Sequence, residues 1–371
     1  MKILFDYQVF NWQKKGGISR FISEIIANLK VQKSNKIALS VINSVNIHYK
    51  TNMLYKSSIR KYALYFYFLF KHGKRALGRF NYFYSVALLE SQKFDVFVPT
   101  YYDNYFLQYI GDKPFVVIVH DMIHEIFPEI LVNSKQLIEQ KKNLIYKSKK
   151  IIAVSISTKN DILKFYPDID PQKIDIVHLG FSVTQKEILP NIKLPKDYIL
   201  FVGERGAYKN FHFFIMSLYK LLLEDNKLHI LCIGGETFSD EELHLFKQLN
   251  ILDKIQQYYA KDEELYTIYH KAKVFVFPSR YEGFGIPILE AMASDCPVVL
   301  SQSSSFPEVA GDAGVYFKLD DEADLYIKVK EMLDNEDHRS FYIKKGRENI
   351  TRFSWLNTAT NCLNVFNEAQ N

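Results

Sequence analysis

The sequence has little cysteine, little net charge and no long apolar run, and each shortage argues against a class of protein. Three cysteines cannot build a disulfide framework or a four-thiolate metal site, which favours a reducing cytoplasm. A formal charge of +5 over 371 residues is too small to indicate nucleic-acid binding, although it permits an anionic substrate or a membrane surface. The most apolar window, "YALYFYFLF" at 62–70, has nine residues, about half of the ~20 that span a bilayer.

What is present is the composition of a globular protein with more than one core. Hydrophobic residues make up 48% of the chain, and its length exceeds that at which a single core keeps growing, so two domains are expected. The N-terminal "MKILFDYQVF" has no small-residue cleavage site, and we expect a first strand there and not a signal peptide. No short-period repeat or low-complexity segment is present, which argues against a solenoid.

Apolar strand patterns alternate with helical patterns along the whole chain. The expected strands are "KILFDY", "KIALSVI", "FDVFVP", "FVVIVHD" and "KIIAVS" in the first half and "YILFVG", "LHILCIGG", "VFVFP" and "PVVLS" in the second. This alternation predicts an α/β protein with a parallel sheet in each half, that is, two Rossmann-like doubly wound domains facing a cleft. A polar, proline-containing seam at 185–198 places the boundary near Leu189, giving domains 1–188 and 189–350.

The stretch "SRYEGFGIPILEAMA", residues 279–293, directly follows an expected buried strand. Gly283 and Gly285 allow a loop whose amides approach a ligand, and Pro287 suits the first turn of a helix. Glu282 is therefore expected in the loop and Glu290 on the helix. Ligands of doubly wound sheets bind beyond the carboxyl ends of strands, so this loop is a candidate site.

Two other strand ends carry candidate ligand-binding residues. Gly16 and Gly17 form a glycine-rich turn before a helix that we expect to begin near Ser19, although an ordinary turn explains the pair equally well. Arg205 and Lys209 lie four residues apart after the first strand of the second half, where both cations could converge on one diphosphate. The alternative for this pair is a solvated face.

Two patterns superficially suggest metal ligands. His120 and His124 are four residues apart, but they follow a strand and lack a third ligand nearby, so hydrogen bonding or proton transfer by His120 is the favoured role. Asp168 and Asp170 have the spacing of an acidic metal-binding pair, but the flanking prolines indicate a surface turn. No metal site is predicted.

The motifs together resemble a known family over nearly the whole chain. They are, in order, "GGISRF", "FDVFVPTYYD", "VHDMIHEIFP", "IIAVSISTKNDI", "FVGERGAYKN", "VFVFPSRYEGFGIPILEAMA" and "RFSWLNTA". The sequence is similar to the retaining, nucleotide-sugar-dependent glycosyltransferases of family 4, which have the GT-B fold and include bacterial mannosyltransferases of surface-polysaccharide synthesis. Two glutamates separated by seven residues, Glu282 and Glu290, are a signature of that family.

The resemblance implies a role for each candidate residue. Glu290 would accept hydrogen bonds from the ribose hydroxyls, and Glu282 would lie by the transferred sugar. The amides at Gly283, Phe284 and Gly285 would approach the sugar, and the helix start at Ile286 would favour the diphosphate. Arg205 and Lys209 would hold the departing diphosphate, His120 would lie near the transferred sugar, and Gly16 and Gly17 would belong to the loop on the opposite domain. The set predicted as catalytic is His120, Glu282, Arg205 and Lys209.

The resemblance also implies the reaction. The protein would transfer a hexose from a nucleotide-diphosphate sugar to a glycan or lipid-linked acceptor with retention of configuration, without a metal or other cofactor. GDP-mannose is the favoured donor, with UDP-sugars as the alternative. A catalytically silent binding protein, and an epimerase or phosphorylase with the same two-domain plan, stay open. Residues 351–371 would form a final helix packing back on the first domain.

The segment 55–84 is basic and aromatic. It contains seven Lys or Arg and no Asp or Glu, interleaved with Tyr and Phe. This pattern is typical of an interfacial element on anionic lipid, and a core helix with a solvated edge is the alternative. The expected location is the cytoplasm, with peripheral contact at the inner face of the membrane as a further hypothesis; no nucleic-acid partner is expected.

Overall fold

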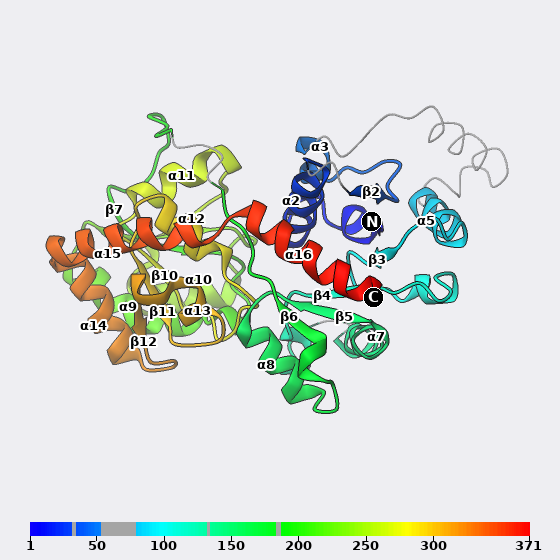
Figure 1. Ribbon diagram of the computed structural model, residues 1–371. Coiled ribbons are helices and arrows are strands. Elements are labelled where there is room, and N and C mark those ends of the chain that lie inside the picture. The colour runs from blue at the N-terminus through cyan, green and yellow to red at the C-terminus, as the bar shows by residue number, and fades with distance from the viewer. Residues whose placement is uncertain (32–34, 53–78, 132–133, 183–186) are drawn as a thin grey trace. The chain divides into compact units, whose positions relative to one another are not determined.

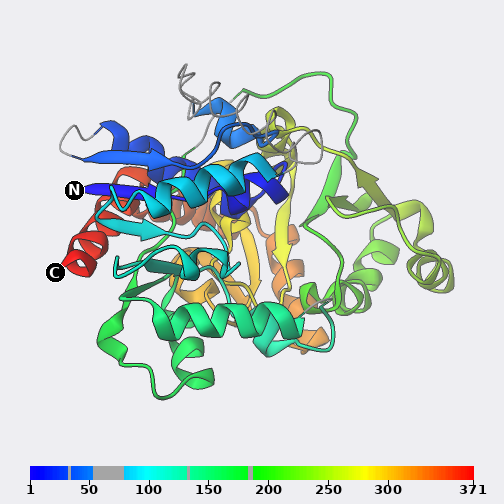
Figure 2. The ribbon, with the colours of Figure 1, turned by 90° about the vertical axis from the view of Figure 1, so that its right-hand side faces the viewer.

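The computed structural model describes residues 1–31, 35–52, 79–131, 134–182 and 187–371. The chain forms two compact units (Figures 1 and 2). The first comprises Met1–Gly180 together with Phe353–Asn371, and the second comprises Phe181–Arg352. The chain therefore leaves the first unit once and returns to it for its last helix.

The first unit is built on parallel strands in two three-stranded sheets joined by one bridge. The strand orders are β2-β1-β3 and β4-β5-β6, and an isolated parallel bridge between Phe97 and Phe115 links β3 to β4. The strands are β1 (Lys2–Phe5), β2 (Lys36–Leu39), β3 (Val96–Val98), β4 (Val116–Val119), β5 (Lys150–Ala153) and β6 (Ile174–Ile176). The chain winds from β1 outward to β2 and then to β3 on the other side, so the topology reverses between β1 and β3.

Helices connect and flank these strands. They are α1 (Gln8–Trp12), α2 (Gly17–Val31), α3 (Ile47–Thr51), α5 (Phe80–Glu90), α6 (Ile123–Ile126), α7 (Ser134–Lys147), α8 (Ile156–Phe165) and α16 (Trp355–Gln370). The last of these packs against α2, as Figure 1 shows for the red and dark blue ribbons, and it also contacts β5. Phe366 of α16 lies edge-on to Phe5 of β1, with ring centroids 6.1 Å apart, so the C-terminal helix completes the core of the first unit.

The second unit has a single six-stranded parallel sheet with the order β12-β11-β10-β7-β8-β9. The strands are β7 (Asp197–Val202), β8 (Leu228–Ile233), β9 (Ile255–Tyr258), β10 (Val274–Phe277), β11 (Val298–Ser301) and β12 (Gly314–Phe317). Counted within the unit, this is the 3-2-1-4-5-6 order of Rossmann folds, and its topological switch point lies between β7 and β10. The helices are α9 (Phe211–Glu224), α10 (Asp240–Gln248), α11 (Asp262–Lys271), α12 (Ile286–Ala293), α13 (Phe306–Ala310), α14 (Glu322–Asp334) and α15 (Glu336–Asn349).

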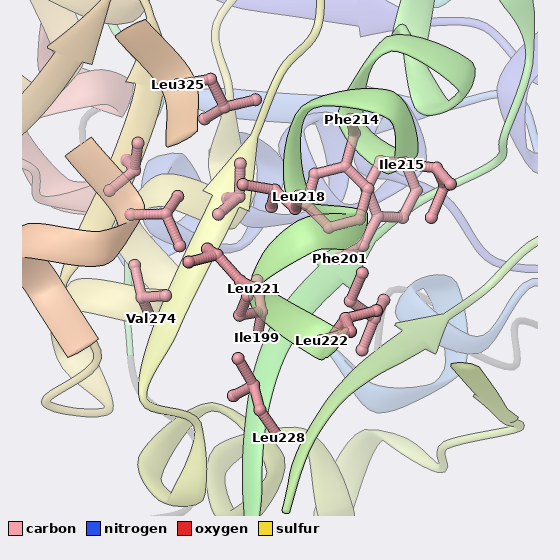
Figure 3. Close-up of a cluster of buried hydrophobic side chains, with 14 of the residues drawn as sticks. Ile199, Phe201, Phe214, Ile215, Leu218, Leu221, Leu222, Leu228, Val274 and Leu325 are labelled. Atoms are coloured by element: carbon pink, nitrogen blue, oxygen red, sulfur yellow. The ribbon is translucent and has the colours of Figure 1, made fainter. Parts of the chain in front are cut away.

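The core of the second unit follows from the apolar periodicity of α9. Phe214, Leu218, Leu221 and Leu222 recur at helical spacing and are buried against the sheet. Figure 3 shows them facing Ile199 and Phe201 of β7, together with side chains from β8, β10 and α14. Each fully buried side chain of this size contributes roughly 1.5–3 kcal/mol, so this core fixes the position of β7 and of the loop that follows it.

All nine strands predicted from the sequence are present, and three strands were missed. The missed strands are β6, β9 and β12, each of which lies at an edge of its sheet. Edge strands are covered on fewer sides, and "IDI" and "IQQY" accordingly contain polar residues, whereas "GVYF" is a short apolar run that the pattern analysis overlooked. The first unit also ends at Gly180, before the expected boundary at 188.

Most of the basic, aromatic segment 55–84 lies outside the described residues, and its described end is the start of α5 at Phe80. Within the part of the chain that the structure describes, no helix combines the length and apolarity needed to cross a bilayer.

Candidate active site

The loop between β10 and α12 has the structure that its sequence predicts. Glu282 lies in the loop, α12 begins at Ile286, and Glu290 lies within that helix. Gly285 has φ +101°, and a Cβ there would approach Ile288 Cδ1 at 3.1 Å and Phe306 Cε1 at 3.2 Å. Only glycine combines this backbone conformation with so little space, which explains the second glycine of the motif.

A run of serines after β11 holds the backbone of this loop. The amide of Glu282 donates to Ser304 Oγ at 3.0 Å, and the single O–H of Ser305 lies within hydrogen-bonding distance of two carbonyl oxygens, that of Glu282 at 2.9 Å and that of Phe284 at 2.8 Å. Ser303 Oγ donates to the carbonyl of Arg280. Sequence reasoning missed these residues, although "SQSSS" directly after a predicted strand was a usable signal.

Lys209 and Glu282 form an ion pair across the topological switch point. Lys209 follows β7 and Glu282 follows β10, and their side chains are 14% and 17% exposed. Lys209 Nζ also lies 5.2 Å from the ring centroid of Phe277 and 5.3 Å from that of Tyr208. An ammonium group has three N–H donors, so one contact with Glu282 leaves capacity for an anionic ligand.

Arg205 does not join that pair in the structure. Its Nε donates to Glu242 Oε1 at 2.7 Å, and its side chain is 6% exposed. The sequence suggested that Arg205 and Lys209 converge; the structure instead anchors Arg205 toward α10 and Lys209 toward the Glu282 loop.

Glu290 is engaged by a tyrosine of the neighbouring helix. The hydroxyl of Tyr269 donates to Glu290 Oε2 at 3.4 Å. Burial, followed by the charge of Glu290, raises the pKa of Tyr269 well above its usual value, so this hydroxyl stays protonated and acts as a donor. Tyr269 thereby orients a carboxylate that sequence reasoning expected to meet ribose hydroxyls.

In the first unit, the buried carboxylate of Asp6, directly after β1, binds Thr100, two residues after β3, at that unit's own switch point. Asp6 Oδ1 accepts from the amide and hydroxyl of Thr100 at 2.8 and 2.6 Å, and Oδ2 accepts from Gln8 Nε2 at 2.7 Å. Burial raises the pKa of Asp6, and these hydrogen bonds oppose that rise. Sequence reasoning did not single out Asp6, because an isolated aspartate at a strand end carries no motif.

The glycine turn before α2 is closed by a side chain. Gln13 Oε1 accepts from the amide of Ser19 at 3.0 Å and lies 2.6 Å from where a Cβ on Gly16 would be, so a side chain at Gly16 would displace the Gln13 amide group. The helix begins at Gly17 and not near Ser19 as expected. One amide of the turn is therefore occupied by the protein itself.

His120 lies at the end of β4 against α2. Its ring is edge-on to Phe21, with centroids 5.5 Å apart, and its amide donates to the hydroxyl of Tyr102 at 3.1 Å. Burial lowers the pKa of His120 to about 4, with Asp121 opposing this shift and Lys141 adding to it. The imidazole is therefore neutral at pH 7 and suited to hydrogen bonding with sugar hydroxyls.

An ion pair buried behind His120 was also missed. Lys141 Nζ donates to Glu125 Oε2 at 2.8 Å and to the carbonyl of Asp121 at 3.0 Å, and the Lys141 side chain is fully buried. It connects α7 to the segment that follows β4. The sequence offered no sign that one lysine of the polar "KQLIEQKKN" would point inward.

The patterns that suggested metal ligands have other partners. Asp168 Oδ2 accepts from Tyr146, and Asp170 Oδ1 accepts from the amide of Gln172 at a short helical turn. Among the described residues, no group of three or more His, Cys, Asp or Glu is arranged to hold a metal ion.

The predicted site residues are divided between the two units. His120, Gly16 and Gly17 belong to the first, and the donor-binding set from Arg205 to Glu290 belongs to the second. In each unit these residues follow the carboxyl ends of parallel strands near the switch point, which is the ligand-binding edge of a Rossmann-like domain. The fold is that of the GT-B glycosyltransferases, and the candidate residues lie where such a fold binds ligands.

Comparison with known proteins supports this class and gives the family. A model described as "Glycosyltransferase Family 4" matches residues 16–185, and one described as "Glycosyl transferases group 1" matches residues 185–349. The two matches together extend from 16 to 349. The chain belongs to the family 4-like glycosyltransferases of the GT-B fold.

Its curated relatives include O-antigen enzymes. O-antigen chain mannosyltransferase B of Escherichia coli is 32% identical over 172 residues, 46% of this chain and 45% of that protein. O-antigen chain mannosyltransferase RfbU of Salmonella typhimurium is 30% identical over 207 residues, 56% of this chain and 57% of that protein. The chain thus spans about half the length of the curated relatives it matches.

Solved structures show the same fold over nearly the whole chain. Sucrose-phosphate synthase from Thermosynechococcus elongatus has a TM-score of 0.72 at 14% identity, covering 99% of this chain and 98% of that one. Anabaena HepE in complex with UDP and glucose has a TM-score of 0.71 at 13% identity, covering 98% of each chain. The GT-B fold predicted from the sequence is confirmed.

Proposed function

We propose that the protein is a retaining hexosyltransferase that moves a hexose from a nucleotide-diphosphate sugar to a glycan or lipid-linked acceptor in surface-polysaccharide synthesis. The observation that carries the proposal is the Lys209–Glu282 pair at the switch point, followed by the glycine-capped start of α12. Family membership and the O-antigen mannosyltransferase relatives support the same activity.

The chemistry follows from where charge develops. Breaking the bond between the anomeric carbon and the phosphate oxygen leaves negative charge on the diphosphate, and the acceptor hydroxyl loses its proton to that leaving oxygen. Lys209 and the positive end of the α12 helix dipole would stabilise the charge. Glu282, whose own charge is offset by Lys209, would accept hydrogen bonds from the sugar hydroxyls without repelling the diphosphate strongly.

The donor is proposed to be GDP-mannose. The two O-antigen mannosyltransferases support mannose, whereas the solved HepE complex contains UDP and glucose. A UDP-sugar is therefore the competing donor.

Nucleotide release decides the donor and the activity together. Purified protein is incubated with GDP-mannose, UDP-glucose or UDP-N-acetylglucosamine and a lipid-linked acceptor, and NMR of the product gives the anomeric configuration. Release from GDP-mannose with a retained linkage is expected, and chelation of divalent metals should leave the rate unchanged. Tight nucleotide binding without release from any donor would instead identify a silent binding protein.

A peripheral membrane role for 55–84 is proposed on sequence grounds alone. Each cation near the surface could add ~1 kcal/mol toward anionic lipid. Flotation with anionic and neutral liposomes compares the protein with a variant in which Lys71, Lys74, Arg75 and Arg79 are changed to Gln. Binding that needs anionic lipid and is weakened in the variant is expected; indifference to both would reject the role.

A further inference from the structure

Arg205 is held by contacts on all three guanidinium nitrogens. Nε donates to Glu242 Oε1 at 2.7 Å, Nη2 donates to the carbonyl of Glu236 at 2.6 Å, and Nη1 donates to the carbonyl of Gly234 at 3.4 Å. With 6% of the side chain exposed, the arginine is fixed and not a mobile surface cation.

The loop after β8 is shaped around this guanidinium. Its carbon lies 4.7 Å from the ring centroid of Phe238 and 5.7 Å from that of Phe211, both within cation–π range. Gly235 has φ +72°, and a Cβ there would lie 3.0 Å from Arg205 Nη1. Gly235 therefore makes room for the arginine head group.

Glu242 is itself fixed by the start of α10. Its Oε2 accepts from the amide of Ser239 at 2.8 Å, and its own amide donates to Ser239 Oγ at 3.2 Å, which completes a capping box. One carboxylate oxygen thus caps the helix while the other holds Arg205. Because Glu242 is held by the start of α10, it also restricts the conformation of the Arg205 side chain.

We propose that Glu242 is a positioning residue for Arg205 in the transfer reaction, an inference that rests on the proposed function. Arginine has five N–H donors, and the contacts within the described residues engage three, which leaves two on the Nη atoms for the diphosphate. Fixing the side chain in advance removes the entropy cost of ordering it when charge develops.

The chain supplies a matched control for helix capping. Glu264 occupies the same third position of α11, and its Oε2 accepts from the amide of Lys261 at 2.7 Å. Its other oxygen accepts from Tyr258 and not from an arginine. Glu264→Ala therefore removes an equivalent cap without touching Arg205.

Steady-state kinetics separate positioning from capping. Glu242→Ala should lower kcat by on the order of 10- to 100-fold, the cost of misplacing a group that acts on the transition state. The donor KM should change by less than about threefold, because the lost interaction develops in the transition state. In Glu242→Gln, one amide oxygen must serve both Arg205 Nε and the Ser239 amide, so its kcat should lie between those of the wild type and Glu242→Ala. Glu264→Ala should keep the wild-type kcat.

A double variant tests whether Glu242 acts through Arg205. Arg205→Ala alone and Arg205→Ala combined with Glu242→Ala should have the same kcat within about twofold, since the positioning residue then has nothing to position. The proposal would be overturned if the kcat losses of the two single variants multiplied in the double variant. A Glu242→Ala enzyme with a higher kcat than the wild type, or a kcat loss in Glu264→Ala equal to that in Glu242→Ala, would overturn it as well.

A spectroscopic measurement keeps this inference distinct from the proposed function. The Nε–H signal of Arg205, assigned by its absence in Arg205→Ala, should resist solvent exchange in the wild type and in Glu264→Ala and be lost in Glu242→Ala. If no donor is turned over, the proposed function fails, and with it the catalytic part of the inference. A rapidly exchanging Nε–H in the wild type would show that Glu242 does not hold Arg205 at all.

Discussion

At the scale of single residues, three lysine or arginine side chains of the candidate site each form an ion pair with a glutamate. Lys209 meets Glu282, Arg205 meets Glu242, and Lys141 meets Glu125. Partly buried ions lose hydration, and pairing recovers part of that loss. The consequence is that most single substitutions here also leave a partner charge exposed to an apolar surrounding, so activity and stability must be measured together.

The two glutamates of the motif should fail in different ways. Glu290→Ala should raise the donor KM about tenfold, because a hydrogen bond to a charged group contributes roughly 1.5–3 kcal/mol. Glu282→Ala should lower kcat by on the order of 100-fold, since its partner Lys209 acts on developing charge. Tyr269→Phe, which removes only the hydroxyl that orients Glu290, should have a smaller effect on KM. Equal, small effects of both glutamate changes would indicate a merely structural loop.

His120, whose pKa is lowered by desolvation, should make the first unit sensitive to acid. Because its folded pKa is about 4, below the usual 6.5, the unfolded chain binds more protons between these values, and stability falls as pH drops from 6.5 to 4. The slope from this residue is at most about 1.4 kcal/mol per pH unit. Urea unfolding at pH 7 and pH 5 should show a smaller acid loss in His120→Gln than in the wild type. The exposed His244→Gln is the control and should keep the wild-type slope.

At the scale of elements, the loop from Arg280 to Gly285 is fixed at both ends and along its backbone. It begins where Arg280 donates its amide to the carbonyl of Tyr208 at 2.8 Å, and it ends in the left-handed Gly285. The serines after β11 bind it in between. The loop is therefore a rigid platform that brings Glu282 to Lys209.

Replacement of Gly285 tests that platform. Gly285→Ala should cost about 1–3 kcal/mol, because the residue keeps a positive φ and its Cβ crowds Ile288 and Phe306. Loss of donor turnover should accompany it, as Glu282 is displaced. Gly206→Ala, where a Cβ would meet nothing within 4 Å, is the matched control and should be neutral or slightly stabilising. The unfolding free energy and kcat of both variants should be measured together. A Gly285→Ala variant with unchanged stability and kcat would show that the loop does not require glycine at this position.

At the scale of the whole molecule, the first unit is discontinuous in sequence. The chain leaves it at Gly180 and re-enters at Phe353, and Thr358 Oγ1 of α16 donates to the carbonyl of His178 at 2.9 Å. A Cβ on Gly180 would clash with the backbone of Trp355, so the two crossings are packed together. Folding of the first unit therefore needs the last residues of the chain.

Phe366→Ala should destabilise the first unit selectively. The ring is fully buried against Phe5, and removal of such a ring costs about 3–5 kcal/mol. Hydrogen exchange should show reduced protection in β1 and α2 while β7 and α9 keep theirs. Phe246→Ala, at an equally buried position in the second unit, should give the reverse pattern. Uniform loss of protection in both variants would show that the units unfold as one.

The sequence by itself determined the class of fold and the loops that contain the candidate site residues. Central strands of a parallel sheet are covered on both faces, so their apolar runs are unmistakable, and the residues after them fall at the ligand-binding edge. The need for glycine at position 285 could also be predicted from local sequence, because the backbone conformation there disfavours other residues.

Only the tertiary structure decided which partners those residues have. The pairing of Arg205 with Glu242, the serines under the Glu282 loop, the buried Lys141 and the hydrogen-bonded Asp6 all join residues from different strand ends or helices. The edge strands likewise depend on a neighbour for their structure. Such contacts depend on how helices and strands pack in three dimensions. A local sequence pattern therefore does not predict which distant side chain will pair with a buried charge.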